Sequence, residues 1–191
     1  MSYDSIKNVA LKLFSEHGYE GASLAQIAER VGIKKQSIYS HFKSKDALFL
    51  QLLNETFLIE QARIKNYLEI HMNKPLYDCL LQSLESYIER FSYDHHLKFF
   101  LRASFFPPNH LYAEVMKALY DHIDHVDELY MATFKKAYKV QNINQLPQTA
   151  TLAFSALIDS ILVELVYGGE ARTRRKLEAT WMIFWKGLTT P

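Results

Sequence analysis

The stretch Ser23–Ile38, SLAQIAERVGIKKQSI, holds three residues at the spacing that two short, steeply crossed helices require. Ala28 offers a small side chain at the crossing point. Gly32, four positions later, tolerates the positive φ of a tight turn. Ile38, six positions further on, gives the second helix an apolar side chain that faces the crossing. The pattern predicts a helix-turn-helix, whose second helix can enter the major groove of DNA.

Capping signals on both sides of this stretch divide it into helices. Ser23 and Gln26 fit a capping box, in which each side chain satisfies a backbone donor at the start of a helix. Before it, an apolar stripe from Ile6 to Phe14 ends at Gly18, a candidate for a helix C-cap. After it, Ser44 is the expected N-cap of a long helix that runs to Met72.

Helical spacing of apolar residues continues through the rest of the chain, and glycine and proline are scarce and lie mostly at punctuating positions. The expected helices lie near 75–93, 96–106, 111–140, 147–167 and 170–188. No alternating strand pattern with turn signals occurs. The sequence therefore predicts an all-α fold of about nine helices.

The distribution of charge favours an anionic partner for the first 50 residues, which hold seven basic and five acidic side chains. Between Arg30 and Lys45 there are five basic residues and no acid. A run of this kind is also compatible with a solvated surface, so alone it indicates phosphate binding only weakly.

The expected subcellular location follows from the single cysteine and from the lack of signal and membrane-spanning patterns. Cys79 is the only cysteine, so no intramolecular disulfide can form and a reducing compartment is expected. The N-terminus has no signal pattern, and no run of 18 residues is both apolar and free of charge. We expect a cytoplasmic protein that does not enter a membrane.

The segment Leu13–Phe49, LFSEHGYEGASLAQIAERVGIKKQSIYSHFKSKDALF, resembles the N-terminal DNA-binding domain of TetR-family transcriptional regulators. Its ending, IYSHFKSKDAL, is the most family-specific part. The resemblance implies a three-helix DNA-binding domain at residues 1–46 and a helical ligand-binding and dimerisation domain at 47–191. It further implies a homodimer that binds a near-palindromic double-stranded operator, usually represses, and is released by a small molecule.

Roles in DNA binding follow from residue chemistry and from the resemblance. Lys35, Gln36 and Ser37 begin the expected recognition helix, where lysine suits guanine and glutamine suits adenine. Lys34 is an additional basic candidate, and Ser40 lies at a position where family members often have an aromatic residue. The resemblance implies phosphate contacts for four further residues. These four are Ser23 (through its hydroxyl or backbone N–H), Tyr39, His41 and Lys45. Alternatively, Tyr39 packs against Phe42 and Phe49, and His41 is a solvated surface residue.

The last two helices are predicted to form the dimer interface. The helix at 147–167 is apolar nearly all round, and the next carries one apolar stripe, so a small monomer cannot easily cover both. The interface candidates are Leu157, Ile161, Leu177, Trp181, Phe184, Trp185 and Leu188. The alternative is that Trp181 and Trp185 complete the core of the monomer.

Many aromatic residues follow the DNA-binding segment, and some of them are expected to line a cavity for a small hydrophobic or amphipathic effector. The candidates are Phe57, Phe100, Met116, Tyr120 and Asp159. Asp159 requires a partner if it is buried, either a protein donor or a cationic ligand.

Catalytic and metal-binding signals are weak. His122 and His125 are three residues apart but have no clear third ligand, so neither a metal nor a cofactor is expected. No nucleophile with a base, phosphate-binding glycine loop or Glu-x-x-His pair occurs, and Cys79 lies on an apolar stretch where an inert thiol is expected. We therefore expect a ligand-responsive DNA-binding repressor and no enzyme. The alternative is a DNA-binding protein without a small ligand, which a protein partner controls or which acts architecturally.

Overall fold

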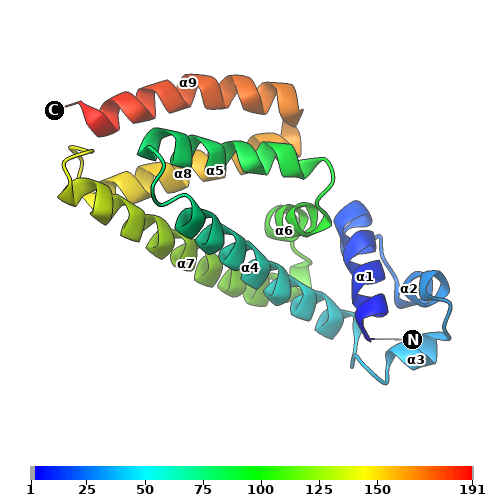
Figure 1. Cartoon of the computed structure of the whole chain (residues 1–191). Coiled ribbons are helices and arrows are strands. Elements are labelled where there is room, and N and C mark those ends of the chain that lie inside the picture. The colour runs from blue at the N-terminus through cyan, green and yellow to red at the C-terminus, as the bar shows by residue number, and fades with distance from the viewer. Residues whose placement is uncertain (1–2, 191) are drawn as a thin grey trace. The chain divides into compact units, whose positions relative to one another are not determined.

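The computed structural model describes residues 3–190, and every regular element in this range is helical (Figure 1). The all-α prediction is confirmed. The elements are α1 (Tyr3–His17), α2 (Leu24–Val31), α3 (Lys35–Ile38), α4 (Lys45–Ile70), α5 (Leu76–Phe91), α6 (His95–Phe105), the 3₁₀ turn η1 (Asn109–Leu111), α7 (Tyr112–Lys139), α8 (Pro147–Tyr167) and α9 (Gly169–Thr189).

The helix ends follow the capping residues of the sequence. Gly18 has φ +71° and donates its N–H to Phe14 O at 2.9 Å, as a C-cap requires. Ser44 caps α4, because its hydroxyl oxygen accepts the N–H of Ala47 at 3.0 Å. The helix ends at Ile70, two residues before the predicted end at Met72.

The chain packs as two compact units. Unit 1 contains the described residues up to Ile59 together with Tyr93–Asp121, and unit 2 contains Glu60–Ser92 and the described residues from His122 onward. Helix α6 packs on α1 within unit 1, so the compact unit that holds the helix-turn-helix is larger than residues 1–46. A functional boundary at residue 46 stays a prediction.

An aromatic cluster forms part of the core of unit 1. The rings of Phe14, Phe49 and Phe99 meet with centroid distances of 5.2 to 6.0 Å, and all three are buried. Since these residues lie on α1, α4 and α6, the cluster joins these three helices, of which α1 packs against α2.

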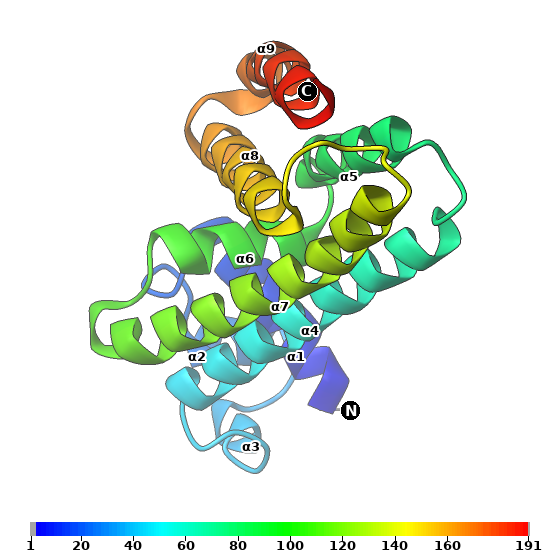
Figure 2. The ribbon, with the colours of Figure 1, turned by 90° about the vertical axis from the view of Figure 1, so that its left-hand side faces the viewer.

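Within unit 2, α9 lies alongside α8 and α5 (Figures 1 and 2). Helix α8 is long and apolar enough to cross a membrane by length and composition. However, half of its apolar window is buried, and Phe154 lies among the rings of Tyr130, Phe134 and Phe184. This packing is that of a core helix.

Candidate nucleic-acid interface

The turn between α2 and α3 has the geometry that the sequence predicts. Gly32 adopts φ +78° and ψ +33°, and its N–H is directed to the carbonyls of Ala28 and Glu29. Ile33 donates its N–H to Ala28 O at 2.9 Å. Ile38 is fully buried and Ala28 nearly so. These contacts fix the direction in which α3 leaves the turn.

The side chains at the start of α3 are exposed. Lys34, Lys35, Gln36 and Ser37 all face solvent, and Lys34 makes no side-chain cap hydrogen bond to the helix. Ile38 points inward from the same single turn of helix. The turn therefore presents two ammonium groups, an amide and a hydroxyl together, which are groups that contact base edges and phosphates.

The residues that follow α3 differ in how far their side chains are available for contacts with DNA. Tyr39 is 51% exposed, which argues against a purely packing role. His41 is exposed and lies edge-on to Tyr3, with ring centroids 5.9 Å apart. Ser40 is exposed, but its hydroxyl already donates to Ser37 O at 2.7 Å. Phe42 is buried in a stack on Tyr3.

Ser23 is less available to phosphate than predicted because the capping box uses both of its donors. Its backbone N–H donates to Gln26 Oε1 at 2.8 Å, and its hydroxyl donates to the same oxygen at 2.9 Å. The hydroxyl oxygen in turn accepts the N–H of Gln26 at 3.2 Å. A phosphate could take a donor from Ser23 only if the Gln26 side chain moved away.

Lys45 also departs from the predicted role of an open phosphate contact. Its Nζ donates to Tyr19 O at 2.8 Å and to Ala22 O at 3.0 Å, and lies 3.7 Å from the centroid of the Tyr19 ring. Two of its three N–H donors are thus used to hold the turn between α1 and α2 against the start of α4. One donor remains for a phosphate.

A polar network beside Lys45 escaped the sequence analysis. Asp46 accepts a hydrogen bond from the Tyr19 hydroxyl and lies 3.3 Å from Nε2 of His110. The bond from Tyr19 is the main cause that lowers the pKa of the Asp46 carboxyl. His110 is 64 positions away in sequence, and no local pattern links it to Asp46.

The predicted effector residues are only partly brought together. Phe57 and Phe100 are buried and meet edge-on, with ring centroids 5.5 Å apart, and Met116 is half-buried in the same unit. Tyr120 is 62% exposed, so it is not part of an enclosed wall. Asp159 lies in unit 2 and is exposed, although partial desolvation and the charge of Asp127 raise its pKa. Since Asp159 is exposed, the condition under which it would require a partner is not met.

Most of the predicted dimer residues are buried within the single chain. Because their side chains already contact their own unit, they cannot supply much surface to a partner. Leu157, Ile161, Leu177, Trp181 and Leu188 are all 8% exposed or less, and Phe184 and Trp185 are half-buried. For Trp181 the alternative of a core role is therefore the better description. The exposed apolar residues of these two helices are different ones, namely Leu152, Val163, Tyr167, Met182 and Ile183.

Three of the histidines, His95, His96 and His122, lie within hydrogen-bonding distance of polar side chains. Nδ1 of His95 lies 3.0 Å from the Ser15 hydroxyl, and Nδ1 of His96 lies 3.1 Å from the Thr56 hydroxyl. His122 is buried, with Nδ1 3.4 Å from Gln61 Nε2. Between residues 3 and 190, no group of three or more His, Cys, Asp or Glu side chains is arranged to hold a metal ion.

A buried ionic network in unit 2 was also missed. Glu60 is 1% exposed and accepts hydrogen bonds from Arg63 (3.0 Å from Nη2) and from both Nη atoms of Arg90. The sequence places Glu60 on a helix but does not reveal that two arginines, one from another helix, converge on it. Such pairing is what permits a carboxylate to be buried.

Comparisons with known proteins show that the N-terminal region is similar to bacterial transcriptional regulators. Residues 6–52 match the sequence model of the family described as bacterial regulatory proteins, tetR family. The chain is 39% identical over 87 residues to IcaR, the negative transcriptional regulator of the biofilm operon icaADBC in Staphylococcus aureus strain Newman. This match covers 44% of the chain and 45% of IcaR. The chain is also 25% identical over 169 residues to the HTH-type transcriptional regulator YerO of Bacillus subtilis. This second match covers 87% of the chain and 57% of YerO. The chain thus matches less than two thirds of the length of either relative.

Solved structures share the fold over nearly the whole chain. The reduced form of NemR from E. coli has a TM-score of 0.77 at 16% identity, with 98% of each chain covered. FadR from Bacillus subtilis in complex with stearoyl-CoA has a TM-score of 0.74 at 16% identity, with 98% of this chain and all of FadR covered. At these identities the similarity establishes the architecture alone.

Proposed function

We propose, from the tetR-family match at residues 6–52, that this chain is a ligand-responsive, DNA-binding transcriptional repressor that acts as a homodimer in the cytoplasm. The single observation that carries the proposal is the turn of α2 and α3, where buried Ile38 and left-handed Gly32 present the exposed side chains of Lys35, Gln36 and Ser37. The relatives are transcriptional regulators, which supports regulation over catalysis.

In this proposal Lys35, Gln36 and Ser37 contact base edges, while Lys34, Tyr39 and His41 contact the phosphate backbone. Phosphate contacts set the position of the protein on the duplex, and base contacts carry the sequence information. Ser23 acts mainly by capping α2, and Lys45 mainly by holding the turn between α1 and α2, because their donors are used within the chain.

The dimer is proposed to form through the exposed apolar residues of α8 and α9. Four large apolar side chains of these helices are exposed to solvent, and burying them in an interface would be favourable. They are Val163 and Tyr167 on α8, and Met182 and Ile183 on α9. A twofold symmetric dimer would present two copies of α3 to successive major grooves, about 34–36 Å apart if the half-sites are one helical turn apart.

The effector is proposed to be a small hydrophobic or amphipathic molecule that binds beside Phe57 and Phe100. These rings lie on α4 and α6, and α4 is a continuous helix that begins at Lys45, which is hydrogen-bonded to the turn that leads into α2. A ligand that alters the pose of α4 would therefore alter that of the DNA-binding turn, with a coupling of about 1–3 kcal/mol.

Fluorescence anisotropy tests the DNA-binding function. The full-length protein is titrated against promoter DNA from its own genomic neighbourhood and against a scrambled duplex, over a salt series. We expect the promoter DNA to bind at least ~10³-fold more tightly than the scrambled duplex, with a steep salt dependence. Lys35→Ala is expected to abolish the preference, whereas Lys65→Ala, an exposed lysine on α4, is expected to preserve it.

Equal and weak binding to both duplexes, with no effect of Lys35→Ala, would contradict the proposal. If specific binding is found but no small hydrophobic or amphipathic compound weakens it, the protein is a DNA-binding protein under the control of a protein partner or with an architectural role.

A further inference from the structure

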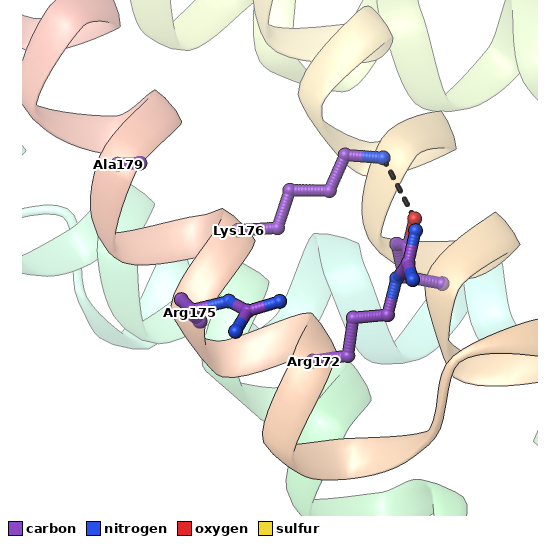
Figure 3. Close-up of a pocket in the computed structure, with 5 residues that line it drawn as sticks. Arg172, Arg175, Lys176 and Ala179 are labelled. Carbon is purple, nitrogen blue, oxygen red and sulfur yellow. Dashed lines mark hydrogen bonds and ion pairs between the residues drawn. The ribbon is translucent and has the colours of Figure 1, made fainter.

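Two networks of charged and polar side chains join neighbouring helices, and they differ in what lies beside them. In unit 2, Glu164 of α8 accepts hydrogen bonds from Arg172 Nε at 2.7 Å and from Lys176 Nζ at 3.0 Å. Figure 3 shows both cationic side chains extending from α9 toward α8. These bonds join the two helices of the proposed dimer interface, and none of the three residues is assigned to DNA. The second network lies in unit 1 and reaches the residues that follow α3.

This second network joins the first two turns of α1 to α4 through two pairs of residues, each four positions apart. Lys7 Nζ donates to both carboxylate oxygens of Glu55, at 2.9 and 2.8 Å. Gln51 Nε2 donates to Glu55 Oε1 at 2.9 Å and also to the hydroxyl oxygen of Tyr3. The hydrogen bond to Glu55 is the main cause that raises the pKa of Lys7, so the ammonium group is charged at neutral pH. The network therefore holds the hydroxyl end of Tyr3 on α4.

The ring of Tyr3 contacts the end of the segment that is proposed to bind DNA. It stacks on the ring of buried Phe42, with centroids 5.0 Å apart and an interplanar angle of 13°. The ring of His41 lies edge-on to it at 5.9 Å, and Lys7 Nζ lies 5.0 Å from its centroid. His41 itself is exposed, and within residues 3–190 its imidazole makes no hydrogen bond. A firmly held tyrosine thus lies against an exposed histidine whose nitrogens are free.

We propose that Tyr3 is a positioning residue of the DNA interface, which holds the imidazole of His41 in the orientation that contacts a phosphate of the duplex. The inference rests on the proposed function, in which His41 contacts the phosphate backbone. A neutral imidazole has one N–H donor to offer to a phosphate oxygen. An exposed side chain loses rotamer freedom when it binds, and a ring that is already held by a neighbour loses less. Tyr3 therefore acts on DNA binding through His41.

A double-mutant cycle on the full-length protein tests the proposal, with the promoter and scrambled duplexes of the anisotropy experiment at a salt concentration low enough for both to bind. Tyr3→Leu removes the ring, whereas Tyr3→Phe keeps the ring and removes only the hydroxyl. We expect Tyr3→Leu to weaken binding to both duplexes by the same factor, about threefold to tenfold, because phosphate contacts carry no sequence information. Tyr3→Phe should bind like the wild type, since the ring still contacts His41 and Phe42.

The same substitution in a His41→Ala background separates positioning from a purely structural role. There Tyr3→Leu should have no further effect on DNA binding, because no imidazole is left to orient. A purely structural role would weaken binding equally with and without His41, and that result would overturn the proposal. So would unchanged binding by Tyr3→Leu. Loss of the preference for promoter DNA in Tyr3→Leu would also overturn it, since the ring would then act on the base contacts of α3.

Tyr93→Leu is the matched control and should bind DNA like the wild type, because Tyr93 is 68% exposed and precedes α6 in the same unit. Urea unfolding shows which variants are folded under the assay conditions. Tyr3→Met, which fills more of the space of the ring, replaces Tyr3→Leu in the cycle if the latter is unfolded. A wild-type protein that binds neither duplex would remove the proposed function and this inference with it. Binding by the wild type with equal effects of Tyr3→Leu in both backgrounds would remove the positioning role alone.

Discussion

Lys45 illustrates how one residue can serve the interface without lying in it. Its ammonium group joins the start of α4 to two carbonyls of the turn between α1 and α2, and that turn leads directly into the capping box of α2. The resemblance implies a phosphate contact for this lysine, but in this chain its ammonium group mainly forms hydrogen bonds within the protein.

Replacing Lys45 by alanine should lower the free energy of unfolding by about 1–3 kcal/mol, because two charge-assisted hydrogen bonds are lost and Tyr19 O and Ala22 O are left to water. Urea unfolding measures the change. Lys43→Ala removes an exposed lysine two positions earlier and should have little effect on stability. Equal stability of the two variants would contradict a stabilising role for Lys45 and leave only the predicted role in DNA binding.

His122 should make the stability of the protein depend on pH. Burial lowers its pKa to about 4, Glu60 opposes the shift, and His125 adds to it. Between pH 6.5 and pH 4 the unfolded chain therefore binds a proton that the folded chain does not. This contribution to stability is complete above pH 6.5 and is lost as the pH falls, by roughly 3 kcal/mol between pH 7 and pH 4.

Thermal unfolding of the wild type and of His122→Gln at several pH values isolates this contribution from that of the carboxylates. The difference between the two proteins should change with pH between 6.5 and 4, since glutamine does not titrate. His17→Gln, an exposed histidine at the end of α1 that does not act on His122, is the control and should follow the wild type. Parallel curves for wild type and His122→Gln would refute the assignment.

At the scale of elements, α3 is too short to be stable by itself. It has four residues, so its conformation depends on the buried Ile38 and on the turn at Gly32. Anything that changes the turn therefore moves the side chains that are proposed to contact DNA.

Gly32→Ala should destabilise the protein by about 1–2 kcal/mol because Gly32 holds a left-handed conformation that alanine adopts only with strain. No atom lies within 4 Å of a Cβ placed there, so the cost is conformational and not steric. Gly187→Ala is the matched control, since this glycine lies inside α9 with equally open space and should gain about 0.5–1 kcal/mol. Chemical denaturation compares the two, and a neutral Gly32→Ala would argue against the predicted turn.

At the scale of the whole molecule, the proposed dimer depends on a few exposed side chains. Met182 and Ile183 are 69% and 76% exposed on α9. Ile183→Asp places a charge in the proposed interface and should shift the protein from dimer to monomer, as measured by sedimentation equilibrium, and weaken operator binding.

Leu58→Asp is the control for this change, because Leu58 is 63% exposed on α4 and lies outside the proposed interface. It should leave the dimer intact. A dimer that survives Ile183→Asp would place the interface on another surface, and a protein that is monomeric before any substitution would remove the twofold model of operator binding.

The sequence by itself determined the elements and the local turn. Ala28, Gly32 and Ile38 specify the crossing of α2 and α3, and Ser23 and Ser44 specify helix starts, because caps, turns and apolar spacing act between residues that are neighbours in the chain. The assignment of the residues that begin α3 to DNA rests on side-chain chemistry and on a family resemblance, and it stays a prediction.

Only the tertiary structure decided which side chains are free. The bonds of Lys45 to the turn after α1, the contact of Asp46 with His110 and the burial of Leu157, Ile161 and Trp181 all depend on elements that are distant in sequence. An apolar stripe in a sequence looks the same whether a neighbouring helix or a second subunit covers it. A lysine likewise has one charge whether it meets a phosphate or a carbonyl. Packing between distant elements makes that choice, since it alone sets which donors and which surfaces remain after the chain has folded.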